Sequence, residues 1–433
     1  MTKTINNENK KLNFSNEREQ SQACLNSAEH EKNQGQKVLN VPNKREQNQT
    51  CLDSAEREGL RPKGNVPNLR FPEFHGEWEK CKLGDIAPLQ RGFDLPTGQI
   101  NNGKFPVVYS NGIMNYHSSY KCVAPGLITG RSGTIGKFTY IEGGYYWPHN
   151  TSLWVTDFYD NNPKFIYYLY QTIRIEQYST GSGVPTLNRN NVHRHQTFIP
   201  KLEEQNKIAI FLSLLDERIA TQNKIIEDLK KLKCAIIDYT IDAIQTDYIE
   251  FSEVYDMAGE GGTPSTSNME YYENGCVPFI KIEDLKQKYL VSNKDYITEL
   301  GLQKSSAWLI PANSILFSNG ATIGEISITT YPVCTKQGIL GIVPKADIDT
   351  EYLYYLMSSR YFKKEICRII TEGTMKTAYL KDINKICCPI PSKAVQQEIV
   401  RIPSALNTKI ETEQSILNKL ICQKQYLLRQ MFI

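Results

Sequence analysis

The sequence contains no run of about 18 consecutive apolar residues, the length that a helix needs to cross a bilayer. Its first residues, MTKTINNENKKLNF, lack the apolar centre of a secretory signal. The 11 cysteines are odd in number and none stands in a C-x-x-C pair. We therefore expect a cytoplasmic protein with reduced thiols and no membrane-spanning segment.

The chain also has little net charge. It carries 50 Lys and Arg residues against 47 Asp and Glu residues, which leaves a net charge of +3. The strongly basic composition of many nucleic-acid binders is missing, so any nucleic-acid-binding surface must be local. At 433 residues the chain has room for two or three domains of about 150 residues each.

Motifs for catalysis are equally scarce. GRSGTIGKF at 130–138 resembles a phosphate-binding loop, but Arg131 stands where the first glycine belongs and Phe138 stands where Ser or Thr belongs. His193 and His195 form H-x-H without a nearby Cys or H-E-x-x-H to complete a metal site. A G-x-S-x-G nucleophile elbow is also missing. We expect no metal and no catalytic residue in this chain.

What the sequence does contain is repetition. Residues 16–31 recur at 43–58 within a segment rich in Asn, Gln, Glu and Lys, so residues 1–64 are interpreted as a low-complexity, disordered tail. A larger repeat follows: GTIGK around Ile135 matches ATIGE around Ile323, and Ile199-Pro200 matches Ile390-Pro391. Glu325 replaces the lysine of GTIGK, so these glycines are expected to form turns with positive φ rather than a phosphate site.

The larger repeat divides the chain into two mixed modules, each followed by a helix. The predicted boundaries are 65–202 for the first module, 203–246 for its helix, 247–391 for the second module and 392–433 for its helix. β-Branched and aromatic runs interleave with helical pieces and show no clean βαβ alternation, which favours an α+β fold over a doubly wound sheet.

The two long helices are predicted to pair with each other. Apolar residues recur with 4-3 spacing, and a polar residue interrupts the seam at equivalent places in both. An antiparallel coiled coil is favoured, because a parallel one would set Lys233 on Lys424. In the predicted register Gln222 meets Lys424 and Lys233 meets Glu413. The predicted apolar layers are Ile219 with Leu427, Ile226 with Leu420, Leu229 with Leu417, and Ile236 with Ile410.

The predicted geometry relates the two modules by an approximate two-fold axis. A helix of about 38 residues spans on the order of 55 Å, which matches one to two turns of duplex DNA at about 34 Å per turn. Within this scheme the second helix is expected to run from about residue 404 to the end. Two ordinary amphipathic helices, each packed on its own module, are the alternative.

With this duplicated organisation the chain resembles the specificity subunits of type I restriction–modification systems. The resemblance covers about residues 65–433 and is carried by NVPNLRFPEFHGEWEKCKLGDIA (65–87), GRSGTIGKF, GVPTLNRNNV (183–192), FIPKLEEQNKIAIFLSLLDERI (198–219) and their second-half counterparts. It implies two target-recognition domains that read a bipartite sequence in double-stranded DNA. It also implies two methyltransferase subunits and restriction/translocase subunits as partners.

The resemblance implies that this chain binds no cofactor, with S-adenosylmethionine, ATP and magnesium on the partner subunits. The sequence agrees that the chain is not an enzyme, because NNPKF has one proline where an adenine methyltransferase carries Asp/Asn-Pro-Pro-aromatic. Two other classes remain for comparison, a protein-interaction scaffold with duplicated modules and a self-contained modification enzyme. Salt-sensitive retention on DNA separates the first of these from a DNA reader.

Candidate DNA-binding residues are the basic and amide side chains beside the glycine turns, because such side chains contact base edges and phosphates. In the first module they are Asn111, Arg131, Ser132, Asn188 and Arg189. In the second they are Lys281, Asn319, Lys336, Gln337 and Lys376.

Overall fold

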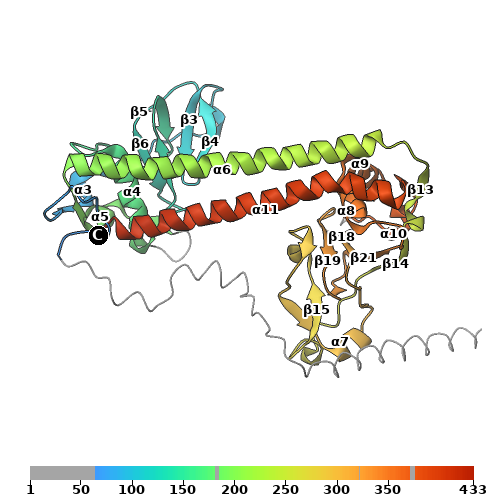
Figure 1. The fold of residues 1–433 in the computed structure, drawn as a ribbon. Coiled ribbons are helices and arrows are strands. Elements are labelled where there is room, and N and C mark those ends of the chain that lie inside the picture. Colours follow the sequence, from blue (N-terminus) through green and yellow to red (C-terminus); the bar gives the residue numbers. More distant parts are fainter. Residues whose placement is uncertain (1–63, 181–184, 321, 371–375) are drawn as a thin grey trace, which may run out of the picture. The chain divides into compact units, whose positions relative to one another are not determined.

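The computed structural model describes residues 64–433 except 181–184, 321 and 371–375. The tail predicted at 1–64 therefore lies outside the described residues apart from Gly64. The described chain is mixed α/β with two long helices, in agreement with the predicted class (Figure 1). Within that part of the chain no helix is long and apolar enough to cross a membrane.

The first module is built on two four-stranded sheets. One has the order β2-β9-β6-β7, formed by Leu89–Arg91, Ser152–Val155, Gly126–Gly130 and Phe138–Ile141. The other has the order β4-β3-β8-β5, formed by Gly112–His117, Phe105–Tyr109, Tyr145–Pro148 and Cys122–Val123. Helix α4 (Pro163–Thr172) buries Phe165, Ile166 and Leu169 in the core of this module.

The second module has a larger main sheet. Its order is β14-β21-β18-β19-β16, formed by Tyr255–Glu260, Ile339–Pro344, Ile315–Ser318, Ile326–Thr329 and Tyr289–Leu290. A three-stranded sheet, β17-β15-β20, is formed by Asp295–Ile297, Val277–Ile280 and Cys334–Thr335. Helices α8 (Thr350–Ser358) and α9 (Arg360–Ile369) contribute Tyr352, Leu356 and Phe362 to the core.

Both modules close in the same way before their long helices begin. Strand β1 (Glu79–Lys82) pairs with β12 (Gln196–Ile199), and β13 (Tyr248–Glu250) pairs with β22 (Cys387–Pro389), both antiparallel. Short helices complete the chain: α3 (Leu83–Ile86), α5 (Arg189–His193), α7 (Glu299–Gln303) and α10 (Leu380–Ile383).

Each long helix is tied to its module near its start by a buried glutamine, and the two glutamines are equivalent in the repeat. Helix α6 spans Leu202–Ala243 and α11 spans Lys393–Gln430. Near the start of α6, Gln205 Oε1 accepts from Asn162 N at 3.0 Å and its Nε2 donates to Pro200 O at 3.0 Å. Near the start of α11, Gln396 Oε1 accepts from Asp349 N at 2.7 Å and its Nε2 donates to Pro391 O at 2.8 Å. These bonds tie each long helix to the capped start of α4 or α8.

Helix α11 begins at Lys393 and contains Pro403. It therefore starts well before residue 404, where the coiled-coil scheme placed its beginning, and close to the segment boundary predicted at residue 392. Proline is normally excluded from a helix interior because it lacks the N–H and its ring crowds the preceding turn. Here Pro403 is buried, and the hydrogen bonds of Gln396 anchor the turns before it, so tertiary packing overrides the local signal.

Helices α6 and α11 lie side by side and run in opposite directions (Figure 1). Their shared apolar cluster contains Ile226, Ile410 and Leu417, with Ile219 and Leu229 packed against it. The first module packs against the start of α6 and the end of α11, and the second against the end of α6 and the start of α11. The two modules therefore lie at opposite ends of the helix pair.

The predicted register of this pair is wrong. Gln222 Nε2 donates to Glu413 O at 3.1 Å and also to the Glu413 carboxylate, instead of meeting Lys424. Lys233 Nζ donates to Asn407 Oδ1 at 3.1 Å.

Two more predicted partners change. Lys424 forms an ion pair with Asp216 at 2.6 Å, and Leu427 joins the core of the first module instead of facing Ile219. The 4-3 pattern is compatible with several axial offsets. Docking of both helix ends on the modules selects one of them, and Ile236 and Leu420 accordingly lie outside the shared Ile226 cluster.

Gln222 and Glu413 stand at equivalent positions of the two repeats, 191 residues apart. Because they contact each other, the local two-fold relation between the helices passes through this pair. Both residues are buried. Hydrogen bonds from Lys409 and Gln222 hold the pKa of Glu413 below its ordinary value.

We expect Gln222→Glu to lower the melting temperature by several degrees at pH 8, because it sets two carboxylates against each other at a buried contact. Protonation near pH 5 should restore most of the loss. The matched variant Glu413→Gln, which leaves two amides, should cost less at pH 8. Thermal unfolding at both pH values tests this, and a loss for Gln222→Glu that does not change with pH would contradict it.

Candidate functional site

A glycine turn organises the candidate site of the first module. Strands β6 and β7 pair antiparallel and are joined by residues 131–137. Gly133 and Gly136 have φ of 78° and 82°, and Gly324 at the equivalent turn of the second module has φ of 104°. The predicted role of these glycines as turn residues is thus confirmed. Lys137 Nζ donates to Asn111 O at 2.8 Å, so its ammonium is engaged by the neighbouring β3–β4 turn.

Hydrogen bonds join two segments that are distant in sequence, the turn after β6 and residues 186–188. Leu187 N donates to Arg131 O at 2.7 Å, and Ser132 forms an isolated bridge with Thr186. Asn188 follows immediately and caps α5, since its Oδ1 accepts from Asn190 N at 3.0 Å. The turn after β6 and the start of α5 therefore share one edge of the module.

Arginine side chains converge at this edge. A cavity of about 420 Å³ is lined by Arg91, Arg131, Asn188, Arg189 and neighbouring residues. Arg91 pairs with Asp94 at 3.3 Å, and both side chains are exposed. Among the described residues Arg131 and Arg189 have no ion pair. Guanidinium groups in such a cavity can bind phosphate or the acceptor edge of guanine in a bidentate manner.

The structure brings together all five residues predicted for the first module. Asn111 follows Ser110, and Ser110 packs closely against Gly130 at the end of β6: a Cβ on that glycine would stand 3.1 Å from the Ser110 Cβ. Arg131 N and Ser132 N both donate to Thr151 O, at 2.9 and 3.4 Å. Of the five, Asn111, Asn188 and Arg189 are exposed, while Arg131 and Ser132 are half-buried.

Arg91 is the residue that the sequence analysis missed. It ends the short strand β2, and only the pairing order β2-β9-β6 carries it to Arg131. The stretch LQRGF (89–93) has no local feature that distinguishes Arg91 from other arginines.

The second module gathers its predicted residues around the matching turn. Asn319 N donates to Gly338 O at 3.0 Å and Ala378 N donates to Asn319 O at 2.9 Å, which brings the segments of Gln337 and Lys376 to the end of β18. Lys336 N donates to Ile280 O at 2.9 Å, so Lys281 also lies near this edge. Lys336, Gln337 and Lys376 are exposed.

Two of these residues do not fit the role predicted for them. Asn319 is only 2% exposed and its Nδ2 donates to Ala378 O at 3.3 Å, so in this structure its side chain holds the turn together instead of facing solvent. Lys281 pairs with Asp295 at 2.9 Å, and this bond raises the pKa of its ammonium. DNA would have to compete with that carboxylate. The match between the two glycine turns suggested Asn319, but burial differs between the copies.

The two histidines of the H-x-H pattern have separate structural partners. Leu89 N donates to His193 Nε2 at 2.8 Å, and Tyr178 Oη lies 2.7 Å from His195 Nδ1. Burial lowers the pKa of both imidazoles. They support the start of β2 and the segment before β10 (Ser179–Thr180) rather than pointing at a common ligand.

Comparison with known proteins points to one family. Residues 75–231 and 246–421 match the type I restriction modification DNA specificity domain. The chain is 32% identical over 173 residues to the MjaIX specificity subunit of Methanocaldococcus jannaschii, covering 39% of each chain. It is 32% identical over 154 residues to the EcoR124I/EcoR124II specificity subunit of Escherichia coli, covering 34% of this chain and 38% of that one. These alignments thus span well under two thirds of the relatives.

Solved structures show the same fold over most of the chain. The S subunit of a type I restriction–modification system from M. genitalium superimposes with a TM-score of 0.54 at 18% identity, covering 85% of this chain and 99% of that one. A second structure, described as concerning complex assembly and conformational transition of the type I system, gives a TM-score of 0.51 at 16% identity. It covers 81% of this chain and 96% of that chain.

The histidines predict an acid sensitivity. Because the folded-state pKa of His193 is lowered, the unfolded chain binds the proton more readily. The contribution of neutral His193 to the free energy of unfolding is therefore complete above the unfolded-state pKa of 6.5. It is lost as pH falls through that value towards the folded-state pKa. We expect His193→Gln, which can still accept from Leu89 N, to reduce the fall in melting temperature between pH 7.5 and 5.5. The exposed His75→Gln is the control and should behave as wild type.

Proposed function

Because the chain belongs to the family of type I restriction–modification DNA specificity domains, we propose that it reads a bipartite DNA sequence and positions methyltransferase and restriction subunits on it. The observation that carries this proposal is the duplication of one module at opposite ends of an antiparallel helix pair. Each copy gathers basic and amide side chains at the turn after its central strand, β6 or β18.

The two-fold relation supports recognition of a split site. Equivalent contacts recur at both ends of the helix pair. Tyr168 Oη donates to Ser213 Oγ at 3.3 Å, and the Tyr355 hydroxyl lies 3.2 Å from Ser404 Oγ. With 42 and 38 residues in the two helices, at about 1.5 Å per residue the spacer is roughly 60 Å long. Two modules separated by roughly this distance fit two half-sites that lie one to two turns of DNA apart.

An outward apolar stripe on the spacer supports docking of partner subunits. On α6, exposed large side chains follow heptad spacing beside the residues that contact α11: Phe211, Leu214, Ile225, Leu232 and Tyr239. On α11, Ile402 and Tyr426 are exposed in the same way. A helical stripe of this kind fits another helix laid against it. We assign it to the methyltransferase subunits.

In this proposal the chain contributes recognition and geometry, and the partners contribute chemistry. S-adenosylmethionine is expected on the methyltransferase subunits, and ATP and magnesium on the restriction/translocase subunits. Base readout falls to Arg131 and Arg189 in the first module and to Lys336, Gln337 and Lys376 in the second. A scaffold that binds only proteins is the competing function.

We expect the triple variant Arg91→Ala/Arg131→Ala/Arg189→Ala to bind cognate duplex DNA about tenfold or more weakly, and to reduce the salt slope of binding by about 1 for each phosphate that the variant no longer binds. Fluorescence anisotropy across a salt series measures both. Arg401→Ala removes an exposed arginine of α11 and should leave binding unchanged. A wild-type chain that shows no salt-sensitive DNA binding, alone or with its methyltransferase partner, would favour the scaffold.

Methylation mapping tests the function in cells. Genomic DNA from cells with the chain should carry adenine methylation at one two-part motif, and cells without it should lose that motif. Exchanging residues 65–202 for the first module of a related chain should change one half of the motif and leave the other intact. Methylation that persists unchanged without the chain would exclude the proposed role.

A further inference from the structure

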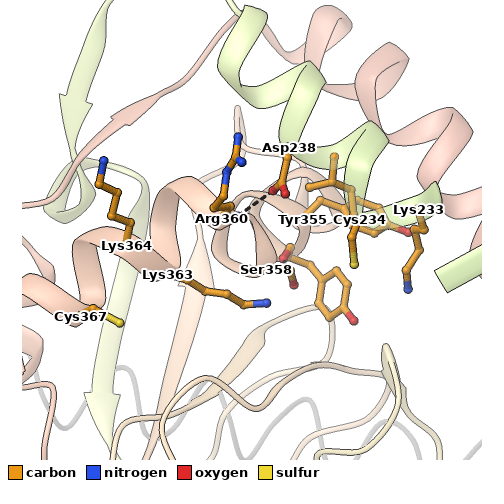
Figure 2. Close-up of a pocket in the computed structure, with 11 residues that line it drawn as sticks. Lys233, Cys234, Asp238, Tyr355, Ser358, Arg360, Lys363, Lys364 and Cys367 are labelled. Atoms are coloured by element: carbon orange, nitrogen blue, oxygen red, sulfur yellow. Dashed lines mark hydrogen bonds between the residues drawn. The ribbon is translucent and has the colours of Figure 1, made fainter. Parts of the chain in front are cut away.

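A basic pocket lies where the second module meets α6. It has a volume of about 410 Å³ and is formed by α6, α8 and α9. Its floor contains buried Ile237 and the rings of Tyr354 and Tyr355. Cations stand around it, namely Lys233, Arg360, Lys363 and Lys364. In Figure 2 the Lys363 side chain extends from α9 towards the α6 side, where Lys233 lies.

The charges of this pocket are not balanced from within. Arg360 pairs with Asp242 at 3.1 Å, and its backbone N–H donates to Asp238 at 2.7 Å. Lys363 and Lys364 have no ion pair with any described residue. Among the described residues Lys233 forms no ion pair; its Nζ donates to Asn407 Oδ1 at 3.1 Å, and burial lowers the pKa of its ammonium. The pocket thus offers three cations to a ligand of opposite charge.

The first half of the molecule shows which anion suits this place. Lys424 is the repeat equivalent of Lys233, and Asp216 is the equivalent of Asn407. In the first half Lys424 Nζ lies 2.6 Å from the Asp216 carboxylate and stacks over the Tyr168 ring at 5.5 Å. The chain therefore supplies its own carboxylate at one end of the spacer. At the other end an uncharged amide takes that position.

Helix α9 makes the second end different in a further way. In the first module the chain after α4 passes into the short 3₁₀ helix Ile175–Tyr178. In the second module α9 follows α8 and places Lys363 and Lys364 among the residues that line the pocket beside α6. The basic surface that α9 brings therefore belongs to the second end of the helix pair.

The surroundings of the pocket indicate a protein occupant. Leu232 and Tyr239, exposed by 48% and 78%, belong to the outward stripe of α6 and bracket the pocket residues Lys233, Cys234, Ile237 and Asp238. A partner segment that lies along this stripe of α6 would therefore also reach the pocket. DNA phosphates bind cations but do not fill an apolar floor, whereas a protein segment can present carboxylates beside apolar side chains.

We infer that this pocket binds an acidic segment of the methyltransferase subunit docked on the second half of the spacer, with a carboxylate placed at Lys233 and Lys363. The inference rests on the proposed function and extends it. The two partner sites are then unequal, because among the described residues Lys424 has a carboxylate partner and its equivalent Lys233 has none. Occupation of the two sites should accordingly depend differently on salt.

The test is Lys363→Glu/Lys364→Glu in the full chain, with Lys294→Glu/Lys304→Glu as a control of equal charge change at exposed positions of the same module. The purified methyltransferase (modification) subunit is titrated onto each chain; calorimetry gives the affinity and mass photometry gives the stoichiometry. We expect one of two binding steps to weaken about tenfold in the pocket variant at low salt. The difference should shrink at high salt, and the control should bind as wild type.

Other outcomes separate the inference from the proposed function. If the pocket variant binds both modification subunits as tightly as wild type, the inference fails and the proposed function stands. If the variant instead loses affinity for DNA while subunit binding is unchanged, the pocket takes phosphate and the inference is overturned. A wild-type chain that binds no modification subunit would overturn both. Melting temperatures of all variants show that folding is preserved.

Discussion

The antiparallel contact between α6 and α11 holds the two modules at their places. Its centre is the buried Gln222–Glu413 pair, with Ile226, Ile410 and Leu417 beside it. Each helix also contributes side chains to the core of both modules, so spacer and modules cannot move independently without breaking apolar packing. The burial of Gln205 and Gln396 at the helix starts fixes the direction in which each helix leaves its module.

The same contact explains how one chain can be symmetric in outline and asymmetric in detail. The helices tolerate Gln at one repeat position and Glu at the other because the amide can donate to the carboxylate. Asp216 and Asn407 differ in the same manner, and here the change leaves Lys233 without a carboxylate while Lys424 has one. Small substitutions at equivalent positions thus give the two ends of the spacer different electrostatics, which is the basis of the unequal partner sites proposed above.

The candidate DNA-facing edges depend on backbone geometry more than on residue type. Gly133 and Gly136 allow the turn after β6 to fold against residues 186–187. This arrangement gathers Arg131, Asn188 and Arg189 from distant parts of the first module. In the second module the same turn buries Asn319, because its backbone and side chain both bond to Ala378. Equivalent turns therefore present different side chains, which is consistent with the proposed recognition of two different half-sites.

The repeat, the long helices and their opposite directions were readable from residue order, because apolar periodicity and duplicated motifs are local properties of the chain. The register of α6 against α11 was not readable, since a 4-3 pattern repeats along the helix and only docking at both ends selects one offset. Arg91 and the basic pocket around Lys363 were also hidden. Both arise where strands or helices distant in sequence pack together, and burial, as at Asn319, depends on neighbours that the local pattern does not name.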